Sequence, residues 1–140
     1  LKSLNQLKTN NNISSTVVLH RSRSGLNAIQ SFLGENGYDT QILLDSGEID
    51  FERESIKICT LSSVKGLEFD NVFIIDLNDD ILPYPPGFNG EDDELHISTE
   101  RRLLYTSMTR ARERLYLLSS GEPSRYLTEI DEDLLVKANN

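Results

Sequence analysis

The segment IKICTLSSVKGLEFDNVFIIDL, residues 56–77, contains two apolar runs separated by a polar connection. The runs Ile56–Leu61 and Asn71–Leu77 are short and rich in β-branched residues, which is typical of strands buried in a parallel sheet. The connection between them carries a glycine, Gly66, and several hydroxyl side chains. The sequence therefore predicts two central strands joined by a loop with polar chemistry.

Toward the N-terminus, the same alternation of strand and helix continues. Thr16–His20 is a β-branched, apolar run bounded by serines, and it predicts a further buried strand. From Ser24 onward, apolar residues fall at helical spacing until Gly37, which can adopt the left-handed conformation that ends a helix. Thr40–Leu44 predicts another strand, and the acidic stretch 45–54 predicts a loop.

Toward the C-terminus, residues 82–93 are rich in proline and glycine and predict an irregular loop. Ser98 or Thr99 is expected to cap a helix with Glu100 in its first turn, and Leu115–Ser119 is expected to form the last strand. The predicted core stripe of this helix is Leu104, Met108 and Ala111. Strands alternating with helices predict an α/β layered domain with a mostly parallel sheet, whose ligands bind at the carboxyl ends of the strands.

The composition limits the possible functions. The 140 residues include 23 Asp and Glu against 14 Lys and Arg, for a net charge of −9, which does not suit a chain that binds nucleic acid by charge alone. The one basic region is residues 98–125, with six arginines and three glutamates. The single cysteine, Cys59, excludes an internal disulfide and favours a reducing compartment, with the cytoplasm as the expected location. Without an apolar leader or a run of roughly 20 apolar residues, neither secretion nor membrane insertion is expected.

Residues 60–70 form the first candidate binding segment. Gly66 allows close backbone approach to a ligand, Lys65 offers a positive charge to a phosphate, and Glu68 can accept hydrogen bonds from sugar hydroxyls. The alternative is that residues 60–70 are an ordinary, capped loop between two strands, in which Lys65 and Glu68 are solvated. Composition alone slightly favours this alternative.

Residues 100–112, ERRLLYTSMTRAR, form the second candidate segment. Arginines on a helix beside a sheet are usually solvated or paired with a nearby glutamate. Arg110 is flanked by the small residues Thr109 and Ala111, which leaves its guanidinium unobstructed. A permanently charged, planar guanidinium is well suited to stabilise a transferring phosphoryl group.

Two of these segments resemble known motifs. TLSSVKGLEFDNVFI, residues 60–74, resembles motif V of superfamily 1 helicases of the UvrD/Rep/PcrA type, and ERRLLYTSMTRARERLYL, residues 100–117, resembles their motif VI. Residues 17–43 are similar to the strand and helix that precede motif V in that family. The resemblance implies the second RecA-like motor domain, 2A, of an ATP-dependent helicase that moves 3′ to 5′ along single-stranded DNA.

The resemblance also implies roles for individual residues. Arg110 takes the place of the motif VI arginine that reaches the γ-phosphate of ATP. Glu68 takes the place of the glutamate that contacts the ribose, with Gly66 and Lys65 beside the nucleotide. The implied nucleic-acid contacts are Thr60, Ser62 and Arg21, although Ser62 stands where the family often has histidine and His20 stands where it has tyrosine.

No G-x-x-x-x-G-K-[ST] sequence occurs in the 140 residues, so the chain has no P-loop of its own. ATP and Mg²⁺ are then expected to bind mainly to an N-terminal P-loop domain outside this chain, and the isolated chain is expected to be inactive. Residues 1–12 are expected to be a lead-in or truncated linker and residues 13–140 the 2A domain. The dozen residues from Asp45 leave no room for the helical 2B insertion.

Two further functions remain open. The same motor could remodel RNA polymerase, as in HelD-type translocases, or the chain could be a structural module. Tyr84 and Phe88 could stack on a base, although loop packing is favoured. A solvated loop is favoured over a cation site at residues 91–94, and a zinc site at His20 or His96 is not expected.

Overall fold

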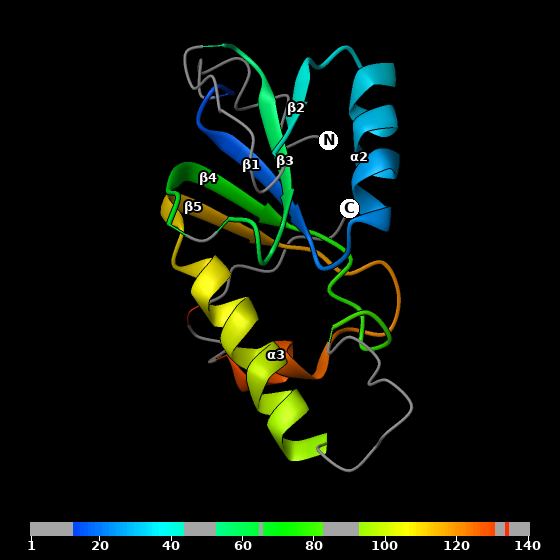
Figure 1. Ribbon diagram of the computed structural model, residues 1–140, viewed down its shortest axis with the longest axis vertical. Helices are drawn as coiled ribbons and strands as arrows, with labels where there is room; N and C mark the ends of the chain where they lie inside the picture. The colour runs from blue at the N-terminus through cyan, green and yellow to red at the C-terminus, as the bar shows by residue number, and fades with distance from the viewer. Residues whose placement is uncertain (1–12, 44–52, 65, 83–92, 131–133, 135–140) are drawn as a thin grey trace.

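Five parallel strands form one sheet in the computed structural model, which describes residues 13–43, 53–64, 66–82, 93–130 and 134. The strands are β1 (Thr16–His20), β2 (Thr40–Ile42), β3 (Ile56–Thr60), β4 (Phe69–Ile74) and β5 (Ala111–Leu117). Their order is β2-β3-β1-β4-β5, and all four neighbouring pairs are parallel (Figure 1). The predicted α/β fold with a parallel sheet is confirmed.

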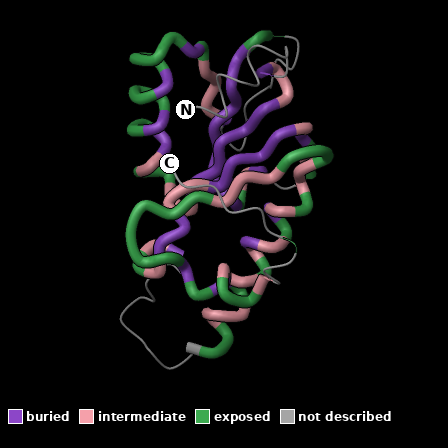
Figure 2. Tube along the Cα trace, turned by 180° about the vertical axis from the view of Figure 1, so that it is seen from behind, coloured by how far each residue is buried: buried purple, intermediate pink, exposed green. Residues whose placement is uncertain are grey.

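The two long helices pack on opposite faces of this sheet. They are α2 (Ser24–Glu35) and α3 (Asp93–Met108), and a short 3₁₀ helix, η2 (Arg125–Glu129), follows β5. Along β1, Val17 belongs to the apolar cluster that contains Leu104 of α3, and Val18 belongs to the cluster that contains Leu26 of α2. Because neighbouring residues of a strand point to opposite faces, the two clusters lie on the two sides of the sheet. Figure 2 shows the strands buried between them.

Helix α3 differs from the sequence prediction at both ends. It begins at Asp93 rather than at Ser98 or Thr99, and it ends at Met108. Glu100 therefore lies in the middle of the helix and not in its first turn. After Met108, the Arg110 amide donates a hydrogen bond to the Ser107 carbonyl at 3.1 Å, a tighter turn than the helix makes.

Strand β5 begins at Ala111, four residues before the predicted start, so Ala111 is not on the helical core stripe. The Phe69 amide donates to the Arg110 carbonyl at 2.9 Å, which pairs the first residues of β4 and β5. The prediction missed this start because Arg112, Glu113 and Arg114 are charged and exposed. Such residues are suited to β5 because it is an edge strand, where charge discourages pairing with another chain.

Lys57, in the interior strand β3, is fully buried. Its ammonium group donates hydrogen bonds to the carbonyl oxygens of Ser14 at 2.8 Å and of Arg53 and Ser55 at 3.0 Å. The side chain thereby ties the start of β3 to the segment before β1. A buried charge is tolerated here because its three donors are satisfied.

Several sequence predictions fall outside the described residues. They concern the lead-in 1–12, most of the acidic loop 45–54, Lys65, Tyr84, Phe88 and the acidic residues 91–92. Among the residues that are described, no helix is long and apolar enough to cross a membrane.

Candidate functional site

The predicted site residues lie in two groups, one where the strands of the sheet begin and one where they end. Thr60 is the last residue of β3 and Phe69 is the first residue of β4, and the two strands run in the same direction. The connection 61–68 therefore returns along the sheet from the edge where the strands end, the carboxyl edge, to the edge where they begin, the amino edge. Thr60 and Ser62 lie at the carboxyl edge, and Glu68 lies at the amino edge.

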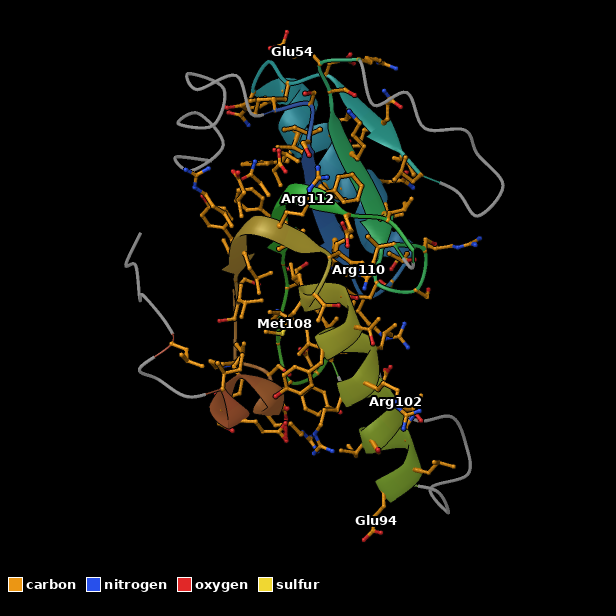
Figure 3. The ribbon with its side chains drawn as sticks, turned by 90° about the vertical axis from the view of Figure 1, so that its left-hand side faces the viewer. Glu54, Glu94, Arg102, Met108, Arg110 and Arg112 are labelled. Carbon is orange, nitrogen blue, oxygen red and sulfur yellow. The ribbon has the colours of Figure 1, made fainter. Side chains whose placement is uncertain are left out.

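Arg110 lies at the amino edge beside Glu68. The hydrogen bond from the Phe69 amide to the Arg110 carbonyl places the residue after Glu68 directly against the Arg110 backbone. Gly66 has a φ of +84°, a conformation that favours glycine and that turns the chain toward this edge. In Figure 3, Arg110 lies between the end of α3 and the start of β5. The structure thus places the backbones of Glu68 and Arg110, two of the four predicted nucleotide contacts, close together.

The guanidinium of Arg110 is only partly bonded. Its Nη2 donates to Thr109 Oγ1 at 3.1 Å, but its Nε is buried and has no hydrogen-bond partner among the described residues. A buried donor without an acceptor costs free energy comparable to a lost hydrogen bond. No carboxylate among the described residues pairs with this half-buried guanidinium, so its Nη groups suit an anion supplied from outside the chain, such as a nucleotide phosphate.

Other arginines of the basic region are paired with carboxylates. Arg112, on the same edge as Arg110, forms an ion pair with Asp70 at 2.9 Å, and Arg101 forms one with Glu129 at 2.9 Å. The hydrogen bonds from Arg101 lower the pKa of the Glu129 carboxyl below its ordinary value. The positive charge counted over residues 98–125 is therefore largely neutralised within the chain.

Hydroxyl groups gather at the carboxyl edge. Thr60 Oγ1 donates to Ser63 Oγ at 2.9 Å and lies 3.2 Å from Ser62 Oγ, and Ser62 is exposed. Thr60 pairs with His20 at the end of β1. Helix α2 starts at Ser24 a few residues later, with no side-chain hydrogen bond capping it and no acidic residue in its first turn. The amides of Gly25 and Leu26 at this helix start already donate to the carbonyls of Ser22 and Arg23, so the hydroxyls are the groups here that suit a phosphate backbone.

Arg21 borders the carboxyl edge but is engaged within the fold. Its Nε lies 3.0 Å and 3.2 Å from the two carboxylate oxygens of Glu100 in α3. Sequence reasoning missed this role for Glu100 because it placed the residue in an exposed first helical turn. The spacing of Glu100, Leu104 and Ser107, all buried, was the available signal for one helical face.

His20 is fixed by two hydrogen bonds. Its Nδ1 accepts from the Ser22 amide at 3.0 Å, so its Nε2 carries the proton that it donates to Asp76 Oδ2 at 2.9 Å. Asp76 adopts a φ of +53°, unusual for a residue other than glycine. The described residues contain no group of three His, Cys, Asp or Glu side chains suited to a metal.

Cys59 is buried in the same sheet, and burial raises the pKa of its thiol to about 12. A thiol that stays protonated at neutral pH is a poor nucleophile. Cys59 therefore packs as a small apolar residue.

The chain is a parallel α/β domain with Glu68 and Arg110 at one edge of the sheet and a cluster of hydroxyl side chains at the other. The model of the UvrD-like helicase C-terminal domain matches residues 39–122, so the chain belongs to that family. This match covers both segments that resemble motifs V and VI. The predicted family is confirmed.

Individual relatives agree with this assignment. The chain is 36% identical over 108 residues to the ATP-dependent DNA helicase PcrA of Staphylococcus epidermidis, and equally so to that of Staphylococcus aureus. In each case the match covers 69% of this chain and 14% of the helicase, so the chain spans a small part of these relatives. The C-terminal domain of a possible DNA helicase from Lactobacillus plantarum has the same fold. It superimposes with a TM-score of 0.68 at 23% identity, covering 95% of this chain and 73% of that one.

Proposed function

We propose that this chain is the C-terminal motor domain of an ATP-dependent 3′ to 5′ DNA translocase or helicase, and that Arg110 is its arginine finger. The observation that supports this most directly is the half-buried Arg110 guanidinium, which has no carboxylate partner among the described residues. The relatives described above are named ATP-dependent DNA helicases. Nothing in those names favours RNA polymerase as the partner.

In this proposal, the amino edge faces ATP and Mg²⁺ held mainly by an N-terminal P-loop domain of the full-length protein. Bound ATP supplies the phosphoryl group whose transfer to water drives the motor. Arg110 stabilises the negative charge that develops on that group, and the Glu68 carboxylate accepts hydrogen bonds from the ribose hydroxyls. Gly66 allows the backbone to approach the nucleotide, and Lys65, outside the described residues, adds a positive charge.

The carboxyl edge is proposed to hold single-stranded DNA. Thr60 and Ser62 offer hydroxyls to the phosphate backbone, and Arg21, whose charge is shared with Glu100, lies beside the start of α2. Because the two sites lie at opposite edges of one sheet, a single rigid domain can contact nucleotide and strand at the same time. Closing and reopening against the P-loop domain would then move the strand.

The experiment compares ATP turnover by the full-length protein with that of Arg110→Ala, each with and without single-stranded DNA. Arg110→Ala is expected to lower turnover by roughly 10³- to 10⁵-fold, the contribution of arginine fingers in related reactions. ATP binding should be nearly unchanged, because the P-loop domain supplies most contacts.

Arg112→Ala is the matched control, because Arg112 lies at the same edge but is paired with Asp70. This variant should keep nearly all of the wild-type turnover. The assignment of Arg110 is wrong if Arg110→Ala turns over ATP as fast as Arg112→Ala does.

A further inference from the structure

Part of one face of the sheet has no described helix over it. Helix α2 packs on the side of the sheet that carries Val18 and Phe73, and it lies over β2 and β3 (Figure 1). Helices α3 and η2 pack on the opposite side. Both faces of the sheet in an α/β domain are normally covered by helices. The side of β4 and β5 that carries Phe73, Arg114 and Tyr116 lacks such a cover among the described residues, and we call it the open face.

Two aromatic rings are stacked on the open face. Phe73 of β4 and Tyr116 of β5 are neighbours in the strand register, and their ring centroids lie 4.2 Å apart with 7° between the ring planes. Phe73 is buried, whereas Tyr116 is partly exposed. Strand β5 is the last strand of the described sheet, so no described strand covers the side of the Tyr116 ring that faces away from Phe73. The stack thus holds a flat aromatic ring at the edge of the sheet.

Arg114 lies beside this ring. It is two residues before Tyr116 on the same strand, so both side chains point to the open face, about 6.6 Å apart along β5. Arg114 is exposed, and its side chain makes one hydrogen bond to a described residue, from Nη1 to Asn71 Oδ1 at 3.5 Å. No carboxylate of the described residues pairs with it, in contrast to Arg112, which pairs with Asp70. The charge of Arg114 is therefore available to an anion.

A ring beside an unpaired guanidinium suits a base and its phosphate. Any base can stack on an aromatic side chain, because every base has a π-face. A guanidinium donates two parallel hydrogen bonds to phosphate oxygens. A protein partner is less suited to this face, because the exposed residues that precede Tyr116 on β5, residues 112–114, are all charged. Charged residues are depleted in the centres of protein–protein interfaces.

We propose that Tyr116 and Arg114 bind one nucleotide of single-stranded DNA on the open face, with the base stacked on the Tyr116 ring and a phosphate paired with Arg114. This inference rests on the proposed function in one respect, that the ligand is a DNA strand. It requires neither Arg110 nor the hydroxyl cluster of the carboxyl edge. Because the chain carries a net charge of −9, affinity at the open face comes from stacking and one ion pair, and not from a general attraction to phosphate.

The test measures binding of a fluorescein-labelled single-stranded oligonucleotide to the full-length protein by anisotropy, at several salt concentrations. Tyr116→Leu is expected to raise the Kd by roughly 5- to 100-fold, the contribution of one base stacked on an aromatic side chain. Tyr116→Phe keeps the ring and should bind like the wild type. Arg114→Gln should raise the Kd and reduce the slope of log K against log salt by about 1, as expected for the loss of one phosphate contact.

Arg112→Gln is the matched control for Arg114→Gln. It removes one positive charge from the same strand, but at a residue that is already paired with Asp70. Its Kd and its salt slope should stay close to those of the wild type. The melting temperature of each variant is measured as well. Because the Arg114 side chain is exposed, Arg114→Gln tests the proposal even if Tyr116→Leu weakens the fold.

A photochemical crosslink locates the base. An oligonucleotide that carries 5-iodouracil is irradiated with the full-length protein, and the protein is digested with trypsin. The crosslink is expected in the peptide 115–125, in which Tyr116 is the sole aromatic residue. Free dTMP at the same concentration as the oligonucleotide should leave this crosslink in place, because the strand is the proposed ligand.

Three results would overturn this proposal and leave the proposed function in place. The first is wild-type affinity in both Tyr116→Leu and Arg114→Gln. The second is wild-type affinity in Tyr116→Leu with a changed molar mass in light scattering, which would assign the open face to a second copy of the chain. The third is loss of the crosslink to equimolar dTMP, which would assign it to a free nucleotide. A wild-type protein that does not bind the oligonucleotide removes the proposed function as well.

Discussion

Replacing Gly25 by alanine is expected to destabilise the domain, while the same change at Gly34 in the same helix is expected to stabilise it. A Cβ atom at residue 25 would lie 2.5 Å from Nδ1 and 2.6 Å from Cδ2 and Cε1 of His20. Unbonded heavy atoms approach favourably only to about 3.5 Å. His20 is 4% exposed and is held at both ring nitrogens, so the ring cannot move aside without losing a hydrogen bond.

The magnitude follows from these contacts. Displacing the ring removes its hydrogen bond to the Asp76 carboxylate, and such bonds to charged groups contribute about 1.5–3 kcal/mol. Alanine regains roughly 0.5–1 kcal/mol over glycine in a helix, so the net loss of stability for Gly25→Ala is about 1–2 kcal/mol. At Gly34 no atom lies within 4 Å of the new Cβ, so the gain of roughly 0.5–1 kcal/mol remains.

The assay is urea unfolding of the 140-residue chain followed by circular dichroism, with the free energy of unfolding taken from the midpoint and slope. In a His20→Ala background the clash is absent, so Gly25→Ala should then behave like Gly34→Ala. The reasoning is refuted if Gly25→Ala alone is as stable as Gly34→Ala, because the His20 ring would then not be fixed.

Three further predictions concern stability and binding. Lys57→Met leaves the carbonyl groups of Ser14, Arg53 and Ser55 without their donor and should cost about 1–3 kcal/mol in urea unfolding, the cost of leaving a buried acceptor unsatisfied. Because Arg101 lowers the pKa of Glu129, their pair stabilises the fold above the ordinary glutamate pKa of about 4.3, and this contribution is lost as the pH falls through the lowered value. Glu129→Gln should therefore flatten the acid side of the stability–pH curve; an unchanged curve would contradict this. DNA affinity of the full-length protein should fall linearly with salt on a log–log plot, and a flat plot would count against phosphate contacts.

The sequence identified the buried strands most reliably. Residues 16–20 and 56–60 are apolar enough to be recognised as strands buried on both faces, and the structure forms β1 and β3 there. Strand β5 was placed too late because its first residues are charged, and only its position at the edge of the sheet explains them. Helix α3 was started too late because a serine and a threonine looked like caps, whereas both lie inside the helix.

The candidate site was predictable in its residues but not in its arrangement. Motif resemblance selected Glu68 and Arg110, and the structure places their backbones side by side. The division of residues 60–68 between two edges could not be deduced, since it depends on β3 and β4 being parallel. The partner of Arg21 could not be deduced either, because Glu100 is 79 residues away and its burial depends on where α3 begins.

The arginines of the basic region show why charge counting fails at this site. Arg101, Arg112 and Arg125 each lie about 3 Å from a carboxylate oxygen, so their charges are neutralised within the fold. Arg102 is exposed and surrounded by water, where a charge contributes little to a specific contact. Arg110 differs from all of them because its Nε is buried and has no acceptor among the described residues. Their positions in the sequence do not show which arginines are paired, so the lack of a partner for Arg110 could be recognised only from the structure.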